Sequence, residues 1–108
     1  MHVSSSTLTG NKVINHHDDD LGKVEDLMID TNSGNVDYAV LSFGGVLGIG
    51  NKLFAIPMNA IEINTEKKCC VLNVEKERLK AAPGFDKDNW PDTADAKWQS
   101  TIRDYYNA

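Results

Sequence analysis

The stretch from Val36 to Pro57 reads VDYAVLSFGGVLGIGNKLFAIP and is the most apolar part of the chain. It predicts two strands joined by a glycine-rich turn. Successive side chains of a strand point to opposite faces, and in the first strand Tyr38 and Val40 alternate with equally apolar residues such as Leu41. A strand that is apolar on both faces has to be covered on both. We therefore expect the core on one side and a helix or a second subunit on the other.

Length and composition limit the fold to one domain. The chain has 108 residues, which is enough for a single modest core and too few for a second. Its apolar content of 41% and charged content of 25% are ordinary for a globular protein. We interpret residues 1–6 as a flexible N-terminal tail. Residues 7–108 form the single domain, which includes a C-terminal helix.

Charge and cysteine content indicate the compartment and exclude some partners. The formal net charge of −5 argues against nucleic acid, since binding to phosphates depends on lysine and arginine. No run of about 18 apolar residues is present, so we expect no membrane insertion, and the first residues do not have the pattern of a secretory signal. Cys69 and Cys70 are neighbours whose side chains point to opposite faces of a predicted strand. We expect no disulfide and a cytoplasmic location.

The strand predicted before the central one has a defect in its alternation. Leu27 and Ile29 share the face that should point to the core, whereas Val24 falls on the other face. A bulge near Glu25-Asp26 would return Val24 to the core side, because one extra residue shifts the alternation by one position. The polar residues 31–35 then close a hairpin, with Gly34 in the left-handed position.

The remaining segments complete a mainly β fold. Further predictions are a strand near residues 12–15, a hairpin over residues 61–74, a short helix over residues 75–82, and a last helix that starts at Asp92 or Asp95 and ends near Tyr106. The apolar stripe of the last helix consists of Trp98, Ile102, Tyr105 and Tyr106. About six short strands with regular turn signals predict a small antiparallel β-barrel with a C-terminal helical extension.

Six segments of the sequence together resemble one known family. They are LGKVEDLMID (residues 21–30), SGNV (33–36), YAVLSFGG (38–45), LFAIP (53–57), LKAAPGFD (79–86) and WPD (90–92). This pattern resembles the PRC-barrel family, named for the photosynthetic reaction centre, and the resemblance covers nearly everything from Thr7 onward. It implies a small β-barrel that often self-associates and serves as a docking or structural module.

The resemblance does not carry a specific activity over to this chain. The family includes the cytoplasmic part of the reaction-centre H subunit and a ribosome-maturation factor that binds a ribosomal protein. We find neither the transmembrane helix of the former nor the second domain of the latter in this sequence, so we transfer neither function. The family has no catalytic signature to map onto residues here.

Three patterns carry residue types that are typical of functional sites. The run His16–Asp20 offers metal ligands, but adjacent residues in a turn seldom converge on one ion, so we expect no metal. The glycines of Gly44–Gly50 are reminiscent of a phosphate-binding loop, yet a strand follows where such loops need a helix, so we expect no cofactor. Glu25, Asp26 and Asp30 could form an acid–base set, but no cleft is visible from the sequence, so a solvated strand face is the default interpretation.

Two classes of function remain. We favour a non-enzymatic interaction or structural module that forms a homodimer and binds a protein partner that the sequence does not identify. The alternative is a small-ligand-binding protein or an enzyme that uses the barrel mouth or the acidic strand. Each apolar cluster has a packing explanation and no nucleophile–base pair stands out. A pocket of ligand size lined by convergent polar groups would favour the alternative.

The glycine-rich turn generates a testable prediction about self-association. We predict a homodimer whose interface includes Val46, Leu47 and Ile49 together with Tyr38 and Val40 of the central strand. Burying each branched side chain of the turn would contribute about 1.5–3 kcal/mol, and a two-fold related copy is the commonest partner. The alternative is that the turn folds back over its own barrel.

Replacing Leu47 with Asp should therefore convert the dimer into a monomer, because the carboxylate would have to be buried. Sedimentation equilibrium measures the change, and far-UV circular dichroism should stay close to that of the parent. A parent protein that sediments as a monomer at tens of micromolar contradicts the prediction. A variant that remains dimeric places the interface elsewhere.

Overall fold

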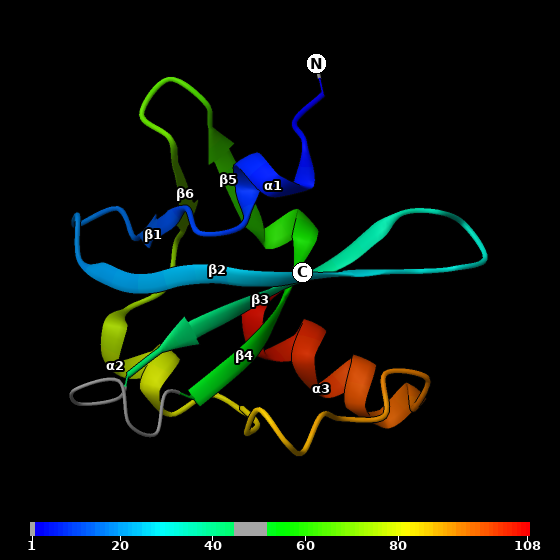
Figure 1. Cartoon of the computed structure of the whole chain (residues 1–108). Coiled ribbons are helices and arrows are strands. Elements are labelled where there is room, and N and C mark those ends of the chain that lie inside the picture. Colours follow the sequence, from blue (N-terminus) through cyan, green and yellow to red (C-terminus); the bar gives the residue numbers. More distant parts are fainter. Residues whose placement is uncertain (1, 45–51) are drawn as a thin grey trace.

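The computed structural model describes residues 2–44 and 52–108, and within these ranges the fold is mainly β (Figure 1). The elements are α1 (Ser5–Leu8), β1 (Lys12–Ile14), β2 (Asp20–Ile29), β3 (Val36–Phe43), β4 (Lys52–Pro57), the 3-10 helix η1 (Met58–Ala60), β5 (Ile61–Asn64), β6 (Cys69–Leu72), α2 (Lys76–Lys80) and α3 (Ala96–Tyr106). Six strands form one curled sheet, a half-barrel, and α3 is the predicted C-terminal helix. The predicted fold class is therefore confirmed. In the described ranges no helix has the length and apolar character needed to cross a membrane.

The strand order is β4-β3-β2-β1-β6-β5. The hairpin pairs β2–β3, β3–β4 and β5–β6 are antiparallel, as is β1–β2, but β1 and β6 run parallel, with Lys12 opposite Cys69. An entirely antiparallel barrel was expected, so this pair corrects the prediction. Hairpin turns force antiparallel pairing. The β1–β6 contact joins distant parts of the chain, and no turn constrains its direction.

The β2–β3 hairpin contains the predicted bulge and a second irregularity. The register shifts between Val24 and Asp26, and Val24 is buried in the core. Gly34 has a φ of +80°, which confirms its left-handed position in the loop. A further shift between Met28 and Ile29 was not predicted. It lies at the end of the hairpin that projects beyond the rest of the sheet (Figure 1), and Ile29 is 58% exposed there, so its expected place in the core was wrong.

The concave side of the sheet holds the main core. Its buried residues are Leu8, Val13, Leu21, Val24, Leu41, Phe54, Ile56, Cys70, Leu72, Val74, Leu79 and Ala82. Leu8 comes from α1, which begins within the segment predicted to be a tail, and Leu79 comes from α2. Both short helices thus contribute apolar side chains to the interior of the half-barrel.

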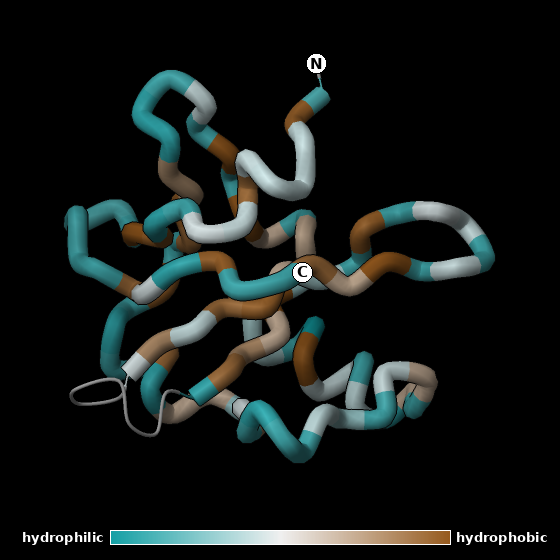
Figure 2. The backbone as a smooth tube through the Cα atoms, in the orientation of Figure 1, coloured by the Kyte–Doolittle hydropathy of each residue, from teal (hydrophilic) through white to brown (hydrophobic). Residues whose placement is uncertain are grey.

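A second, smaller cluster lies on the convex side, where α3 runs along β4 (Figure 1). We call Tyr38, Val40 and Ala55 the outer face of β3 and β4, because they alternate with the core residues of the two strands. The ring of Trp98 of α3 packs at a tilt against that of Tyr38, with centroids 5.2 Å apart, and Ile102 is fully buried. Figure 2 shows that apolar residues concentrate along β3 and β4. The expectation that β3 is covered on both faces is confirmed, and the second cover is a helix.

The ends of α3 follow from local sequence. Asp95 is the N-cap, and its side chain accepts a hydrogen bond from the backbone N–H of Lys97 at 2.9 Å. Of the two predicted starts, Asp92 and Asp95, the second is confirmed. Asn107 ends the helix in a left-handed conformation with φ of 56°.

The close approach of β2 to β3 makes Gly22 harder to replace than Gly34. Gly22 has a φ of +97°, and a Cβ there would lie 2.1 Å from the carbonyl oxygen of Ser42. Gly34 has a similar φ of +80°, but a Cβ there would meet nothing within 4 Å. Both changes to alanine incur the cost of a left-handed residue, about 1–2 kcal/mol. Only Gly22→Ala adds a clash, which costs about 1–3 kcal/mol more.

Urea denaturation of Gly22→Ala and Gly34→Ala should therefore show a clearly lower free energy of unfolding for the first variant. Equal midpoints for the two variants would mean that β2 does not pack against the Ser42 backbone as closely as described.

Candidate functional site

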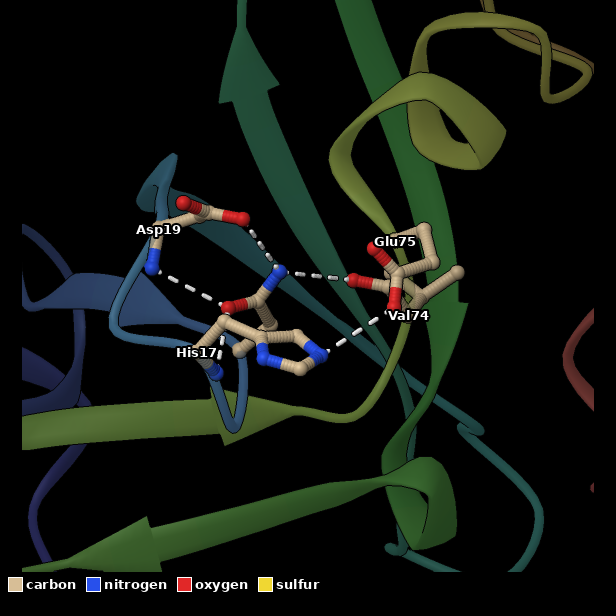
Figure 3. A network of polar contacts seen from close by, with 5 residues as sticks. His17, Asp19, Val74 and Glu75 are labelled. Carbon is tan, nitrogen blue, oxygen red and sulfur yellow. Dashed lines mark hydrogen bonds and ion pairs between the residues drawn. The ribbon is translucent and has the colours of Figure 1, made fainter.

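The polar run His16–Asp20, considered above as a source of metal ligands, folds around one buried side chain, that of Asn15. Asn15 is 2% exposed, and its Oδ1 accepts hydrogen bonds from the backbone N–H groups of His17 (2.9 Å) and Asp19 (3.0 Å). Its Nδ2 donates to Asp19 Oδ2 and to the carbonyl oxygen of Val74, each at 3.1 Å (Figure 3). The amide therefore holds the β1–β2 turn and ties it to the segment before α2.

A second contact joins the same two segments. His17 Nε2 lies 3.3 Å from Glu75 Oε1, and both side chains are largely exposed (Figure 3). His17 and Asp19 thus already have partners other than a metal. Across residues 2–44 and 52–108, no three His, Cys, Asp or Glu side chains gather closely enough to hold an ion. The geometry of the run is that of a structural turn.

The acidic residues of β2 also satisfy their own backbone. Asp26 Oδ1 accepts from the N–H of Leu27 at 2.8 Å. Asp30 accepts from the N–H of Asn32 at 3.0 Å and from the hydroxyl of Ser33 at 3.1 Å. These hydrogen bonds hold the pKa of Asp30 below its usual value. A carboxyl group needs a raised pKa to donate a proton near neutral pH, and the pKa of Asp30 is lowered instead. Its ionised side chain accepts hydrogen bonds that hold the hairpin loop. Glu25 is exposed on the same strand.

The residues predicted to form a dimer interface fall into two groups. Val46, Leu47 and Ile49 lie outside the described residues. Tyr38 and Val40 are buried within the single chain, and Tyr38 lies against α3. Contact between this pair and a second copy would require α3 to move, and their interface role stays a prediction.

Open grooves flank α3 on the outer side of the sheet. One of about 550 Å³ is lined by Ile29, Asp30 and Tyr38 of the hairpin and by Gln99 of α3. A second of about 600 Å³ includes Val36, Asp37 and Arg103 among its lining residues. A third of about 280 Å³ lies at the other edge of the helix, beside Trp98 and Ile102. Helix and sheet are therefore in contact along one line and diverge on both sides of it.

Two of the polar side chains that line these grooves are hydrogen-bonded to their neighbours. Gln99 Nε2 donates to the carbonyl oxygen of Thr93 at 2.6 Å, and Asp30 is bound by its own loop. Ligand sites combine enclosure with a few convergent polar groups. The grooves have the volume of ligand sites but are open to solvent. We interpret them as the gaps that remain where a helix packs on a curved sheet.

One polar clamp fastens α3 at its C-terminal end. Arg78 Nη2 donates to the carbonyl oxygen of Tyr105 at 2.7 Å, and the Tyr105 hydroxyl donates back to the carbonyl oxygen of Arg78. The guanidinium lies 4.4 Å from the centroid of the Tyr105 ring. The next residue, Tyr106, has a buried hydroxyl for which no partner is found in the described part of the chain. Burial raises the pKa of that hydroxyl.

Both cysteines are buried and free. Burial and the neighbouring Cys69 raise the pKa of the Cys70 thiol. Since the thiolate is the reactive form, this environment favours an inert core residue.

Sequence reasoning missed Asn15 and the Arg78–Tyr105 clamp. A signal for Asn15 existed, because asparagine at a strand end before polar residues is typical of a side-chain-capped turn. Its bond to Val74 spans 59 residues and the clamp spans 27, so neither partner could be read from local sequence.

Comparison with known proteins gives one family and one structural likeness. The family model of the PRC-barrel domain matches residues 1–79. Among solved structures, the chain is similar to RimM of Pseudomonas aeruginosa, a protein assigned to 16S ribosomal RNA processing, with 16% identity and a TM-score of 0.46. The likeness covers 69% of this chain and 45% of that one, so the chain spans less than half of the length of RimM. No curated protein is similar enough to count as a match.

The Asn15 network predicts a difference between two neighbouring substitutions. Asn15→Ala leaves the N–H groups of His17 and Asp19 and the carbonyl of Val74 without their partner, and a buried group left unpaired costs about 1–3 kcal/mol. His17→Ala removes only an exposed ion pair. Thermal unfolding should show a large loss of stability for Asn15→Ala and a melting temperature close to that of the parent for His17→Ala. The reverse order would mean that the ion pair holds the turn.

Proposed function

Because the chain belongs to the PRC-barrel domain family, we propose that it is a non-enzymatic protein-interaction or structural module that self-associates and binds a protein partner. The matched residues 1–79 include all six strands and most of α2. The family resemblance implies a docking or structural role for such a barrel.

The observation that carries the proposal is a partly exposed apolar pair at the end of the β2–β3 hairpin. Ile29 is 58% exposed and lies opposite Val36, which is half-buried. Figure 2 shows brown, apolar positions on both arms of this projecting hairpin, next to a polar tip. Single exposed apolar residues are common on protein surfaces. A cross-strand pair that borders a groove is a better basis for a contact surface.

Charged residues frame this pair. Asp30 and Asp37 lie in the same hairpin, and Arg103 of α3 shares a groove with Asp37 and Val36. An apolar centre within a polar rim is the usual composition of a protein interface. We call Ile29, Asp30, Val36 and Asp37 the hairpin end and propose it as the surface that meets a protein partner.

A ligand-binding or enzymatic role is the second candidate. The grooves beside α3 fall within the volume range of small-molecule sites. Two of the side chains that would orient a ligand there, Gln99 and Asp30, are already hydrogen-bonded to Thr93 and to the hairpin loop. This favours the interaction module.

The test compares two isoleucines on different strands. Affinity purification from the native host would use the parent, Ile29→Asp at the hairpin end and Ile63→Asp on β5, where Ile63 is 36% exposed. We expect one protein to co-purify in stoichiometric amount with the parent and with Ile63→Asp, and to be lost from Ile29→Asp, because a carboxylate replaces the apolar centre. Self-association is tested separately by the Leu47→Asp variant.

A parent that captures no protein and sediments as a monomer would contradict the interaction module. Turnover of a small molecule by the purified parent would replace it with the enzymatic candidate.

A further inference from the structure

The helix α3 is held on the sheet by a small apolar contact. It covers the outer face of β3 and β4, yet Ile102 is the only residue of the helix that is fully buried. Trp98 is half-buried against Tyr38. The concave core, by contrast, is formed by buried residues between Leu8 and Ala82, and at the end of α3 the half-buried Tyr105 and Tyr106 pack against it. The cover of the outer face is thus the weaker of the two apolar layers.

The hydrogen bonds that join α3 to the rest of the chain are concentrated at its C-terminal end. Its hydrogen bonds to another element, among those described, come from the Arg78–Tyr105 clamp at the C-terminal end. At the N-terminal end Asp95 and Gln99 bond only to residues nearby in sequence. The segment before the helix is largely exposed from Asp86 to Trp90. The buried hydroxyl of Tyr106, which has no hydrogen-bond partner among the described residues, is a further cost of the docked position.

The outer face continues into the proposed contact surface. The groove of about 550 Å³ runs between α3 and the β2–β3 hairpin, and both Ile29 of the hairpin end and Tyr38 of the outer face line it. If α3 moved away, Tyr38, Val40 and Ala55 would form one apolar strip with the exposed Ile29–Val36 pair. The helix therefore occupies part of a longer surface.

We propose that the outer face is a helix-docking site and that α3 is its built-in occupant, which a partner helix displaces. The inference rests on the proposed function and states where and how the partner binds. The chemistry of the partner follows from α3 itself, whose contacts read Trp98-x3-Ile102-Arg103-x2-Tyr106. The basic residue suits the acidic hairpin end, because Arg103 shares a groove with Asp37. The partner is an amphipathic helix with two aromatic residues, one aliphatic residue and an arginine or lysine in this spacing.

The first measurement asks whether α3 opens. Native-state hydrogen exchange of the full chain should show the amides of α3 exchanging through an opening that leaves the amides of β2 and β3 protected. Exchange of α3 only together with global unfolding would overturn the inference. It would leave the proposed function standing, because the hairpin end is accessible in either case.

The second measurement asks whether a helix binds in place of α3. A fluorescent peptide of residues 92–108 is titrated into the full chain and into Trp98→Ala/Ile102→Ala, which weakens α3 and leaves the outer face intact. We expect the variant to bind at least about tenfold more tightly than the parent, since a site that is occupied most of the time has a reduced apparent affinity. A control peptide with the same two alanines should bind neither protein.

The peptide titration requires a folded variant. Circular dichroism confirms that the variant is folded; if it is not, Asp95→Ala/Tyr105→Phe loosens the cap and the clamp without emptying the apolar cluster. Equal affinity for parent and folded variant, or no binding to either, would overturn the inference. A variant that binds the peptide, while neither protein captures a cellular partner and the parent sediments as a monomer, would contradict the proposed function alone.

Discussion

The structure depends on a strand, β3, that is apolar on both of its faces. Leu41 and Phe43 pack in the concave core, and Tyr38, on the opposite face, packs in the convex cluster. A strand of this kind is stable only between two layers. The curl of the sheet supplies one layer and α3 supplies the other. The fold is thus larger than a barrel alone: its convex cover comes from residues that follow the part matched by the family model.

Local features of the fold could be predicted because each has a local cause. The bulge after Val24 follows from a break in alternation, the φ of Gly34 from a short loop, and the start of α3 from the carboxylate of Asp95. The two-sided cover of β3 follows from its own composition. Features that depend on distant partners were missed, namely the parallel β1–β6 pair and the bond from Asn15 to Val74. The exposure of Ile29 was also missed, because a second shift in register left no trace in the alternation.

The candidate site could be predicted less well than the fold. Sequence patterns drew attention to His16–Asp20 and to the acidic residues of β2, and the structure uses both to shape turns. Sequence reasoning predicts Tyr38 in an interface with a second chain, and this stays a prediction; within the single chain, Tyr38 lies against α3. The same apolar character explains both, because burial by either surface removes the same area from water. The two possible partners of this surface differ because α3 belongs to the same chain. Its effective concentration at the outer face is therefore higher than that of a separate molecule.

The parallel pairing of β1 with β6 has a consequence for how the chain reaches this structure. β1 lies between β2 and β6 in the sheet, and Lys12 meets Cys69 only after nearly two thirds of the chain has been made. Until then the far edge of β1 has no strand beside it, while β2, β3 and β4 are able to pair with one another because they follow one another in the chain. Contacts of long sequence separation form late and slowly, and an unpaired strand edge is open to other chains in the meantime. During synthesis β1 is therefore the strand that remains longest without its second neighbour. Its free edge is the one most exposed to pairing with other nascent chains.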